Sequence, residues 1–283
     1  MSDPWLRATS VAPYELVEPT LQLHWAAQYL ASAGQTFVEP RSDDSHRSMT
    51  WSHALRSFVG EPLSGPDPIR VALRPLDLTL LLVGPGDDEL GTLPLAGRTR
   101  DEGYEWLSRA IATYLDGPPP LIERPEYDMP EHPVMRGARF STGIERELAA
   151  LEALFAGAAG LLHEIATHRG DASPVRVWPH HFDIAALCAL DRDADGTATK
   201  TVGIGLAPMG GGYDEWYAYV SPWPSPDPGD LPELEGPAFW HTQGWTGAVL
   251  TASNVAVAEP GQRAHLVARF YEDAIPKAEA GLG

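Results

Sequence analysis

The segment 117–133 (GPPPLIERPEYDMPEHP) constrains the fold most, because its dense prolines exclude a regular helix or a central strand. Proline removes a backbone donor and fixes φ, so an extended connector is expected here. Helical and strand-like patterns lie on both sides of it. The sequence therefore predicts a single α+β unit over 1–283, with two halves, 20–116 and 140–283, that the connector 117–133 joins.

The apolar residues of 20–33 recur at helical spacing, with Thr20 as the expected N-cap and Gly34 as the expected stop. Further helices are expected over 99–115, 144–168 and 261–278. Short strands are expected at 50–59, 70–73, 76–83, 91–96, 175–177, 182–190, 201–207, 215–220 and 246–251. This order predicts two pseudo-repeated halves, each an antiparallel sheet bracketed by helices.

The charge balance limits the partners. The chain has 20 basic and 39 acidic residues, a formal net charge of -19, which disfavours nucleic acid and anionic membrane surfaces. Its single cysteine, Cys188, excludes an internal disulfide and is expected to be a buried thiol in a reducing compartment. The N-terminal residues lack the pattern of a secretory signal. A cytoplasmic protein is therefore predicted, and the sequence does not fix its oligomeric state.

The stretch 175–187 (VRVWPHHFDIAAL) carries titratable side chains inside an apolar run. If residues 175–185 are extended throughout, His181 and Asp183 share one face, and Trp178 and His180 share the other. His181 and Asp183 could then act in catalysis or bind one ion. The alternative is that both histidines are hydrogen-bonded groups of a packed core.

The loop SDDSH supplies Asp43, Asp44 and His46. Together with His181 and Asp183, these side chains are of the ligand types suited to a divalent transition metal. The same composition is ordinary turn material. On the preceding helix His24 lies one turn before Gln28, so both side chains can face the same space.

The segment AFWHTQGWTGAV places His241 between Trp240 and Trp245. Aromatic side chains beside a polar group make suitable walls for a small-molecule pocket. They are equally suited to packing a long loop onto a sheet.

Four segments resemble an uncharacterised bacterial family of domain-of-unknown-function proteins with a Trp-Pro-His-His-Phe-Asp-type motif. They are LHWAAQYLASAG, LDLTLLLVGPGDDELGTLPL, SPVRVWPHHFDIAAL and YAYVSPWP, the last followed by a final helix. The resemblance extends over 21–278. It implies a single two-part α+β unit and carries no assigned activity.

Three functions remain open from the sequence. The first is a small-molecule enzyme with His181, Asp183 and His241 as catalytic residues. This enzyme could hold a metal ion as its cofactor. Its ligand-binding residues would be Trp178, His180, Trp240, Trp245 and His24. The second is a non-catalytic binding module with a tryptophan-lined pocket. The third is a scaffold that docks partners through the proline-rich loops 117–133 and 221–237.

Overall fold

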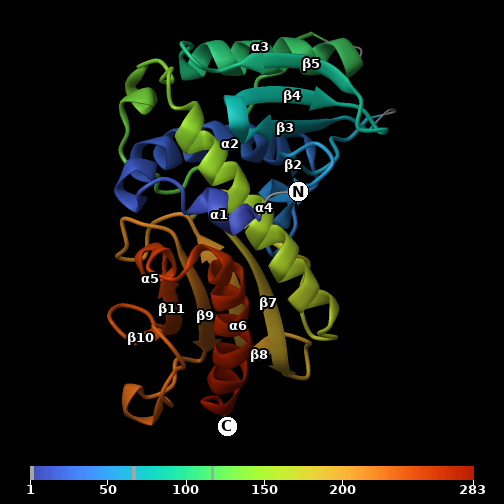
Figure 1. The fold of residues 1–283 in the computed structure, drawn as a ribbon. Helices are drawn as coiled ribbons and strands as arrows, with labels where there is room; N and C mark the ends of the chain where they lie inside the picture. The colour runs from blue at the N-terminus through green and yellow to red at the C-terminus, as the bar shows by residue number, and fades with distance from the viewer. Residues whose placement is uncertain (1–2, 66–67, 116–117) are drawn as a thin grey trace. The chain divides into compact units, whose positions relative to one another are not determined.

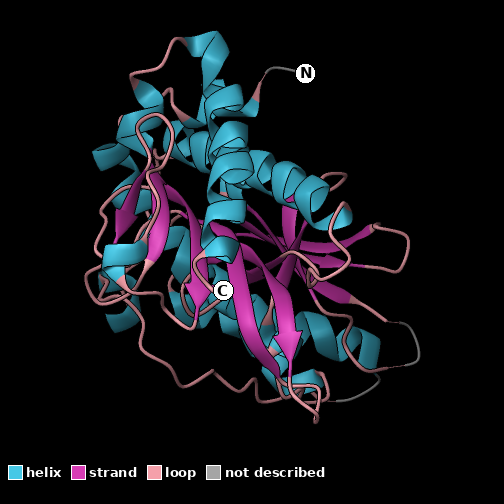
Figure 2. Ribbon diagram, turned by 90° about the horizontal axis from the view of Figure 1, so that it is seen from below, coloured by secondary structure: helices cyan, strands magenta, loops and turns pink. Residues whose placement is uncertain are grey.

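The computed structural model describes residues 3–65, 68–115 and 118–283, so residue 116 and the first residue of the predicted connector, Gly117, lie outside the described residues. The chain forms two compact units. Unit 1 contains the N-terminal residues through Tyr14, residues 153–176 and residues 183–283. Unit 2 contains residues 15–152 and 177–182. Both contain helices and antiparallel strands (Figure 2), and this confirms the predicted α+β class.

The boundaries between the units do not coincide with the connector. One lies within a long helix, α4 (Glu145–Thr167), between residues 152 and 153, and residues 118–133 lie wholly in unit 2. The internal repeat of two halves stays a prediction.

Unit 2 carries a sheet in the order β6-β1-β2-β3-β4-β5, and its paired strands are antiparallel. The strands are β1 (Met49–Ser52), β2 (Ser57–Gly60), β3 (Arg70–Arg74), β4 (Thr79–Val83), β5 (Glu89–Pro94) and β6 (Arg176–Trp178), whose first residue belongs to unit 1. Its helices are α2 (Val17–Phe37), α3 (Arg100–Leu115) and the first turns of α4 (Figure 1). Every residue of β4 is buried, so this strand lies in the core of the unit.

Helix α2 is longer than predicted at both ends. Thr20 lies inside the helix rather than at its N-cap, and the helix continues past Gly34 to Phe37. A Cβ at Gly34 would lie 2.2 Å from the carbonyl oxygen of His46, in the short 3-10 turn η2 (Ser45–Arg47). Glycine is therefore present for a close approach of two backbone segments and does not end the helix.

The proline-rich connector has no regular secondary structure over 118–132 and follows α2 in the opposite chain direction. The Glu123 N–H donates to Thr36 Oγ1 at 2.9 Å, and Trp25 Nε1 donates to the Pro130 carbonyl oxygen at 3.1 Å. Near the start of α2, His132 Nε2 lies 3.0 Å from a Glu18 carboxylate oxygen. Hydrogen bonds near the start, in the middle and near the end of α2 thus fix the connector residues.

Unit 1 carries antiparallel strands in the order β10-β11-β9-β8-β7. Its strands and helices are β7 (Asp183–Arg192), β8 (Ala198–Ala207), β9 (Tyr217–Trp223), β10 (Phe239–His241), β11 (Gly247–Thr251), α1 (Pro4–Ala8), α5 (Ala252–Ala256) and α6 (Arg263–Ala280). Helix α6 packs across β8, β9 and β11 (Figure 1). The cross-strand neighbours Leu206, Ala218 and Leu250 are fully buried and belong to this core.

Among the described residues, α4 is the one helix long and apolar enough to cross a membrane by length and composition. This is weak evidence for a membrane span, because 61% of its apolar window is buried and a core helix meets the same criteria.

Candidate functional site

Residues 179–182, which we call the histidine turn, connect β6 to β7. Phe182 has a φ of 58°, and its N–H donates to the Trp178 carbonyl oxygen at 2.7 Å. The chain is therefore not extended throughout 175–185, so the condition under which His181 and Asp183 would share one face is not met. His181 and Asp183 do not alternate along one strand, because His181 lies in the turn, in unit 2, and Asp183 begins β7, in unit 1.

Helix α2 holds the histidine turn through one carbonyl group. His24 Nε2 and Gln28 Nε2 both donate to the Pro179 carbonyl oxygen, at 2.8 and 2.9 Å. A carbonyl only accepts, so the His24 hydrogen is assigned to Nε2. The His24 ring also stacks on Phe182, with centroids 5.0 Å apart. The predicted convergence of His24 and Gln28 is confirmed.

Gln28 extends this network to the connector. Its Nε2 also donates to the His24 carbonyl oxygen at 3.1 Å, and its Oε1 accepts a hydrogen bond from the Tyr127 hydroxyl. Because Gln28 is buried, each of these partners replaces a water molecule that it would otherwise bind. The network links α2, the connector and the histidine turn.

His24 is neutral in the folded protein at neutral pH. Burial lowers its pKa from 6.5 to about 4, while the hydrogen bond to Pro179 acts in the opposite direction. His24 is thus a buried, neutral side chain that donates a hydrogen bond to the histidine turn, and its role in ligand binding stays a prediction.

His180 and His181 are exposed at the tip of the turn, with ring centroids 4.3 Å apart. Within the described chain, neither ring forms a hydrogen bond, so their nitrogens are available to a ligand. Trp178 and Tyr127 lie edge-on to His180, at centroid distances of 6.2 and 6.1 Å. Partial burial lowers the pKa of His180, as do His181 and the Arg47 guanidinium, and Asp44 opposes this shift.

Arg47 connects the histidine turn to a pocket in unit 2. Its guanidinium lies over the Tyr127 ring, 5.9 Å from the centroid. The cavity has a volume of about 500 Å³, and we call it the arginine pocket. Its lining residues come from α2, from η2 and from the connector: Gln35, Arg47, Glu123, Arg124, Pro125 and Glu126. Sequence patterns gave no indication of this pocket.

The predicted metal loop is held by local hydrogen bonds instead. Asp43 Oδ1 accepts from the Ser45 N–H at 3.0 Å, Asp44 pairs with Arg47 at 2.6 Å, and His46 Nδ1 accepts from the Arg41 N–H at 3.2 Å. Burial, followed by the Arg47 charge, lowers the pKa of His46. In the part of the chain that the structure describes, no group of three or more His, Cys, Asp or Glu side chains could hold a metal ion. Asp43, Asp44 and His46 therefore form no ligand set with His181 and Asp183.

Three other predicted residues meet in unit 1. Asp183 Oδ2 accepts from the Tyr219 hydroxyl at 2.5 Å, and Tyr219 lies 6.5 Å from Trp245 between ring centroids. The His241 ring stacks on Trp245 at 4.5 Å. Tyr219 joins them, and sequence reasoning missed it, although Tyr217 and Tyr219 alternate on β9 as residues of one face do.

The ring nitrogens of His241 and Trp245 already form hydrogen bonds within this aromatic cluster. His241 Nε2 donates to the Gln243 carbonyl oxygen at 2.7 Å, so its Nδ1 accepts from the Tyr213 hydroxyl at 2.9 Å. Trp245 Nε1 donates to the Gly211 carbonyl oxygen at 3.0 Å. The ring centroids lie 4.5 to 6.5 Å apart, which is ordinary packing. The cluster thus favours the packing interpretation of His241 and Trp245.

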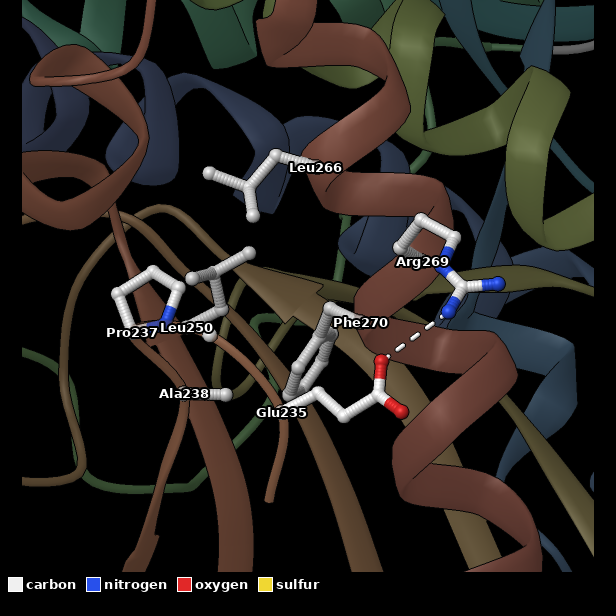
Figure 3. Close-up of a pocket in the computed structure, with 8 residues that line it drawn as sticks. Glu235, Pro237, Ala238, Leu250, Leu266, Arg269 and Phe270 are labelled. Atoms are coloured by element: carbon white, nitrogen blue, oxygen red, sulfur yellow. Dashed lines mark hydrogen bonds and ion pairs between the residues drawn. The ribbon is translucent and has the colours of Figure 1, made fainter.

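Trp240 faces a different environment from the cluster, since its Nε1 donates to the Pro232 carbonyl oxygen at 2.7 Å. Near its strand lies an apolar cavity of about 120 Å³, lined by Leu250, Leu266 and Phe270, with a Glu235–Arg269 ion pair of 3.0 Å at its edge (Figure 3). None of the predicted site residues lines this cavity.

No protein-family model, no curated protein and no solved structure matches the chain. The family resemblance of the sequence stays a prediction, and the functional argument rests on geometry.

Proposed function

We propose that the protein is a small-molecule enzyme in which His180 and His181 transfer protons beside the arginine pocket. The observation that carries this proposal is the fixed presentation of two exposed rings. His24 and Gln28 use buried polar groups to hold the Pro179 carbonyl. Burying polar side chains costs free energy that burying two apolar side chains would not cost. A buried polar network of this kind is typical of a functional site.

The protonation state supports a general base. The lowered pKa of His180 leaves its ring neutral at pH 7, so a ring nitrogen can accept a proton from a bound molecule. The electron pair stays on that molecule, and the Arg47 guanidinium nearby would stabilise the resulting negative charge. Two imidazoles alone are too few ligands for a tight zinc site, so we derive no step through a metal.

We place this activity in the cytoplasm, as the composition favours, and in the bacterial family that the four segments resemble. The partner we propose is a small molecule rather than nucleic acid or a membrane surface. A non-catalytic binding module would use the same pocket without turnover, and the experiment below separates the two.

The test is ligand binding and hydrogen–deuterium exchange in D2O, followed by ¹H NMR. A panel of small carboxylic acids, amino acids, phosphomonoesters and sugars is added to the wild type and to His180→Ala/His181→Ala. We expect at least one compound to bind both proteins but to exchange a proton only with the wild type. His163→Ala/His168→Ala removes two exposed histidines from unit 1 and is the matched control. Binding without exchange or conversion by the wild type would leave a binding module, and exchange unaffected by the histidine substitutions would contradict the proposal.

A further inference from the structure

Two arginines line the arginine pocket in the same manner. Arg47 lies over the Tyr127 ring at 5.9 Å, and Arg124 lies over the Tyr104 ring at 4.3 Å. A guanidinium over an aromatic face is held by cation–π attraction and by the flat contact between the two groups. Both cations are therefore positioned before any ligand enters.

Each guanidinium keeps donors for a ligand. Arg47 pairs with Asp44 at 2.6 Å, and Arg124 pairs with Asp101 at 2.8 Å, each through one nitrogen. A guanidinium has five N–H donors in a planar fork that matches a carboxylate. The two acidic partners therefore orient the arginines and leave part of each fork for a second oxyanion.

The opposite charge lines the same pocket. Glu123 and Glu126 both line the pocket. Neither carboxylate forms an ion pair with any residue that the structure describes. The Glu123 backbone is fixed by its N–H bond to Thr36 Oγ1 at 2.9 Å. Two arginines and two glutamates thus line a cavity of about 500 Å³, a volume in the range of small-molecule sites.

This charge arrangement selects between ligand classes. A simple anion is attracted by the two arginines but repelled by the two carboxylates. A simple cation is attracted by the two carboxylates but repelled by the two arginines. A molecule with separate positive and negative ends satisfies both. We infer that the arginine pocket binds a small zwitterion of the amino-acid class, with its carboxylate at Arg47 and Arg124 and its ammonium group at Glu123 and Glu126. This inference rests on the proposed function in taking the pocket as the ligand site.

The test uses L-alanine, L-glutamine and L-phenylalanine as zwitterionic probes. Propionate is alanine without its amino group, and ethylamine is alanine without its carboxylate. Isothermal titration calorimetry should give at least one amino acid a Kd at least tenfold below those of propionate and ethylamine. Arg124→Gln and Glu126→Gln should each weaken that binding by about tenfold or more, equivalent to about 1.4 kcal/mol.

Matched controls lie on α3, outside the pocket. Arg109→Gln and Glu105→Gln make the same charge changes at two exposed residues, whose side chains are 68% and 69% exposed, and should leave the Kd unchanged. Circular dichroism and the Tm of each variant establish that it is folded. Equal binding of propionate and alanine, or no binding of any amino acid, would overturn the inference, as would amino-acid binding that Arg124→Gln and Glu126→Gln leave intact.

The histidine resonances separate this inference from the proposed function. If amino acids bind as expected but His180 and His181 neither shift nor exchange a proton with the ligand, the zwitterion site stands and the proposed catalysis fails. If the amino acids do not bind and another panel compound undergoes exchange that requires both histidines, the enzyme stands and the zwitterion assignment fails.

Discussion

His24 Nε2 donates to the carbonyl oxygen of Pro179 at 2.8 Å, and this contact joins a helix near the N-terminus to a turn 155 residues later in the chain. It fixes the residue that precedes the two exposed histidines. The same carbonyl accepts from Gln28, one helical turn after His24. The position of the histidine turn in unit 2 therefore depends on two buried polar side chains of α2 as well as on contacts of the turn's own Phe182.

The first prediction concerns pH. The pKa of His24 is about 4 in the folded protein and 6.5 in the unfolded chain, so between these values only the unfolded state binds the proton. Its contribution to stability is complete above pH 6.5 and is lost as the pH falls to 4. The full loss is on the order of 3 kcal/mol. Urea unfolding across this pH range measures it.

His24→Gln is the control for that experiment, because it removes the titrating ring and keeps a side-chain donor. His46 also has a lowered pKa, but it titrates in both proteins and cancels in the difference. The stability of the wild type should fall more steeply with decreasing pH than that of His24→Gln. Parallel curves would mean that His24 is not buried in its neutral form.

The second prediction concerns the bond between the connector and α2. Tyr127→Phe removes the hydroxyl that donates to Gln28 Oε1 and leaves a buried acceptor without that donor. The expected cost is about 1–2 kcal/mol of unfolding free energy, measured with urea. Tyr14→Phe is the control, because Tyr14 is 78% exposed. Equal stabilities of the two variants would show that the Tyr127–Gln28 contact contributes nothing.

The third prediction compares two glycines in helices. Gly34→Ala places a methyl group 2.2 Å from the His46 carbonyl oxygen, so α2 and η2 must move apart. The expected loss is about 2 kcal/mol, despite the better helix propensity of alanine.

Gly160→Ala on α4 is the matched control, because its new Cβ meets no atom within 4 Å. It should raise stability by about 0.5–1 kcal/mol. Thermal unfolding of both variants gives the comparison. A Gly34→Ala protein as stable as Gly160→Ala would contradict the close approach of α2 and η2.

Local patterns predicted the elements whose residues repeat regularly. The helices expected at 99–115 and 144–168 are Arg100–Leu115 and Glu145–Thr167. Strand β10 was missed, because its residues Phe239–His241 show no alternation of buried and exposed side chains. The end of α2 was predicted at Gly34 because a glycine after an apolar stripe usually ends a helix. The actual role of Gly34 depends on its contact with the turn at residues 45–47. The sequence pattern around Gly34 holds no information about this contact.

The candidate site was predictable only where its residues share one element. The spacing of His24 and Gln28 predicted a common face, and the apolar context of His180 and His181 indicated an unusual segment. Tyr127 donates to Gln28 across 99 residues of chain, and the proline-rich connector that carries it was expected only to link two halves. The arginine pocket likewise depends on how the connector lies along α2, which is a tertiary property.

The last prediction concerns an ion pair in unit 2 in which the carboxylate is buried. Arg56 Nε and Nη2 donate to the two carboxylate oxygens of Glu152, each at 2.7 Å. The Glu152 side chain is only 5% exposed, whereas that of Arg56 is 53% exposed. Arg56→Ala leaves a buried carboxylate without this partner and should cost about 2–3 kcal/mol, below the usual cost for fully buried pairs because water reaches Arg56.

The double variant Arg56→Ala/Glu152→Leu removes the charge as well as its partner. It should recover part of the loss, since an apolar side chain of similar volume needs no hydrogen bonds in a buried position. Arg109→Ala on α3 breaks an exposed pair of 3.9 Å and should change the unfolding free energy by less than about 0.5 kcal/mol. Urea unfolding of the four proteins gives the comparison. If Arg56→Ala is no more costly than Arg109→Ala, the Arg56–Glu152 pair does not stabilise unit 2.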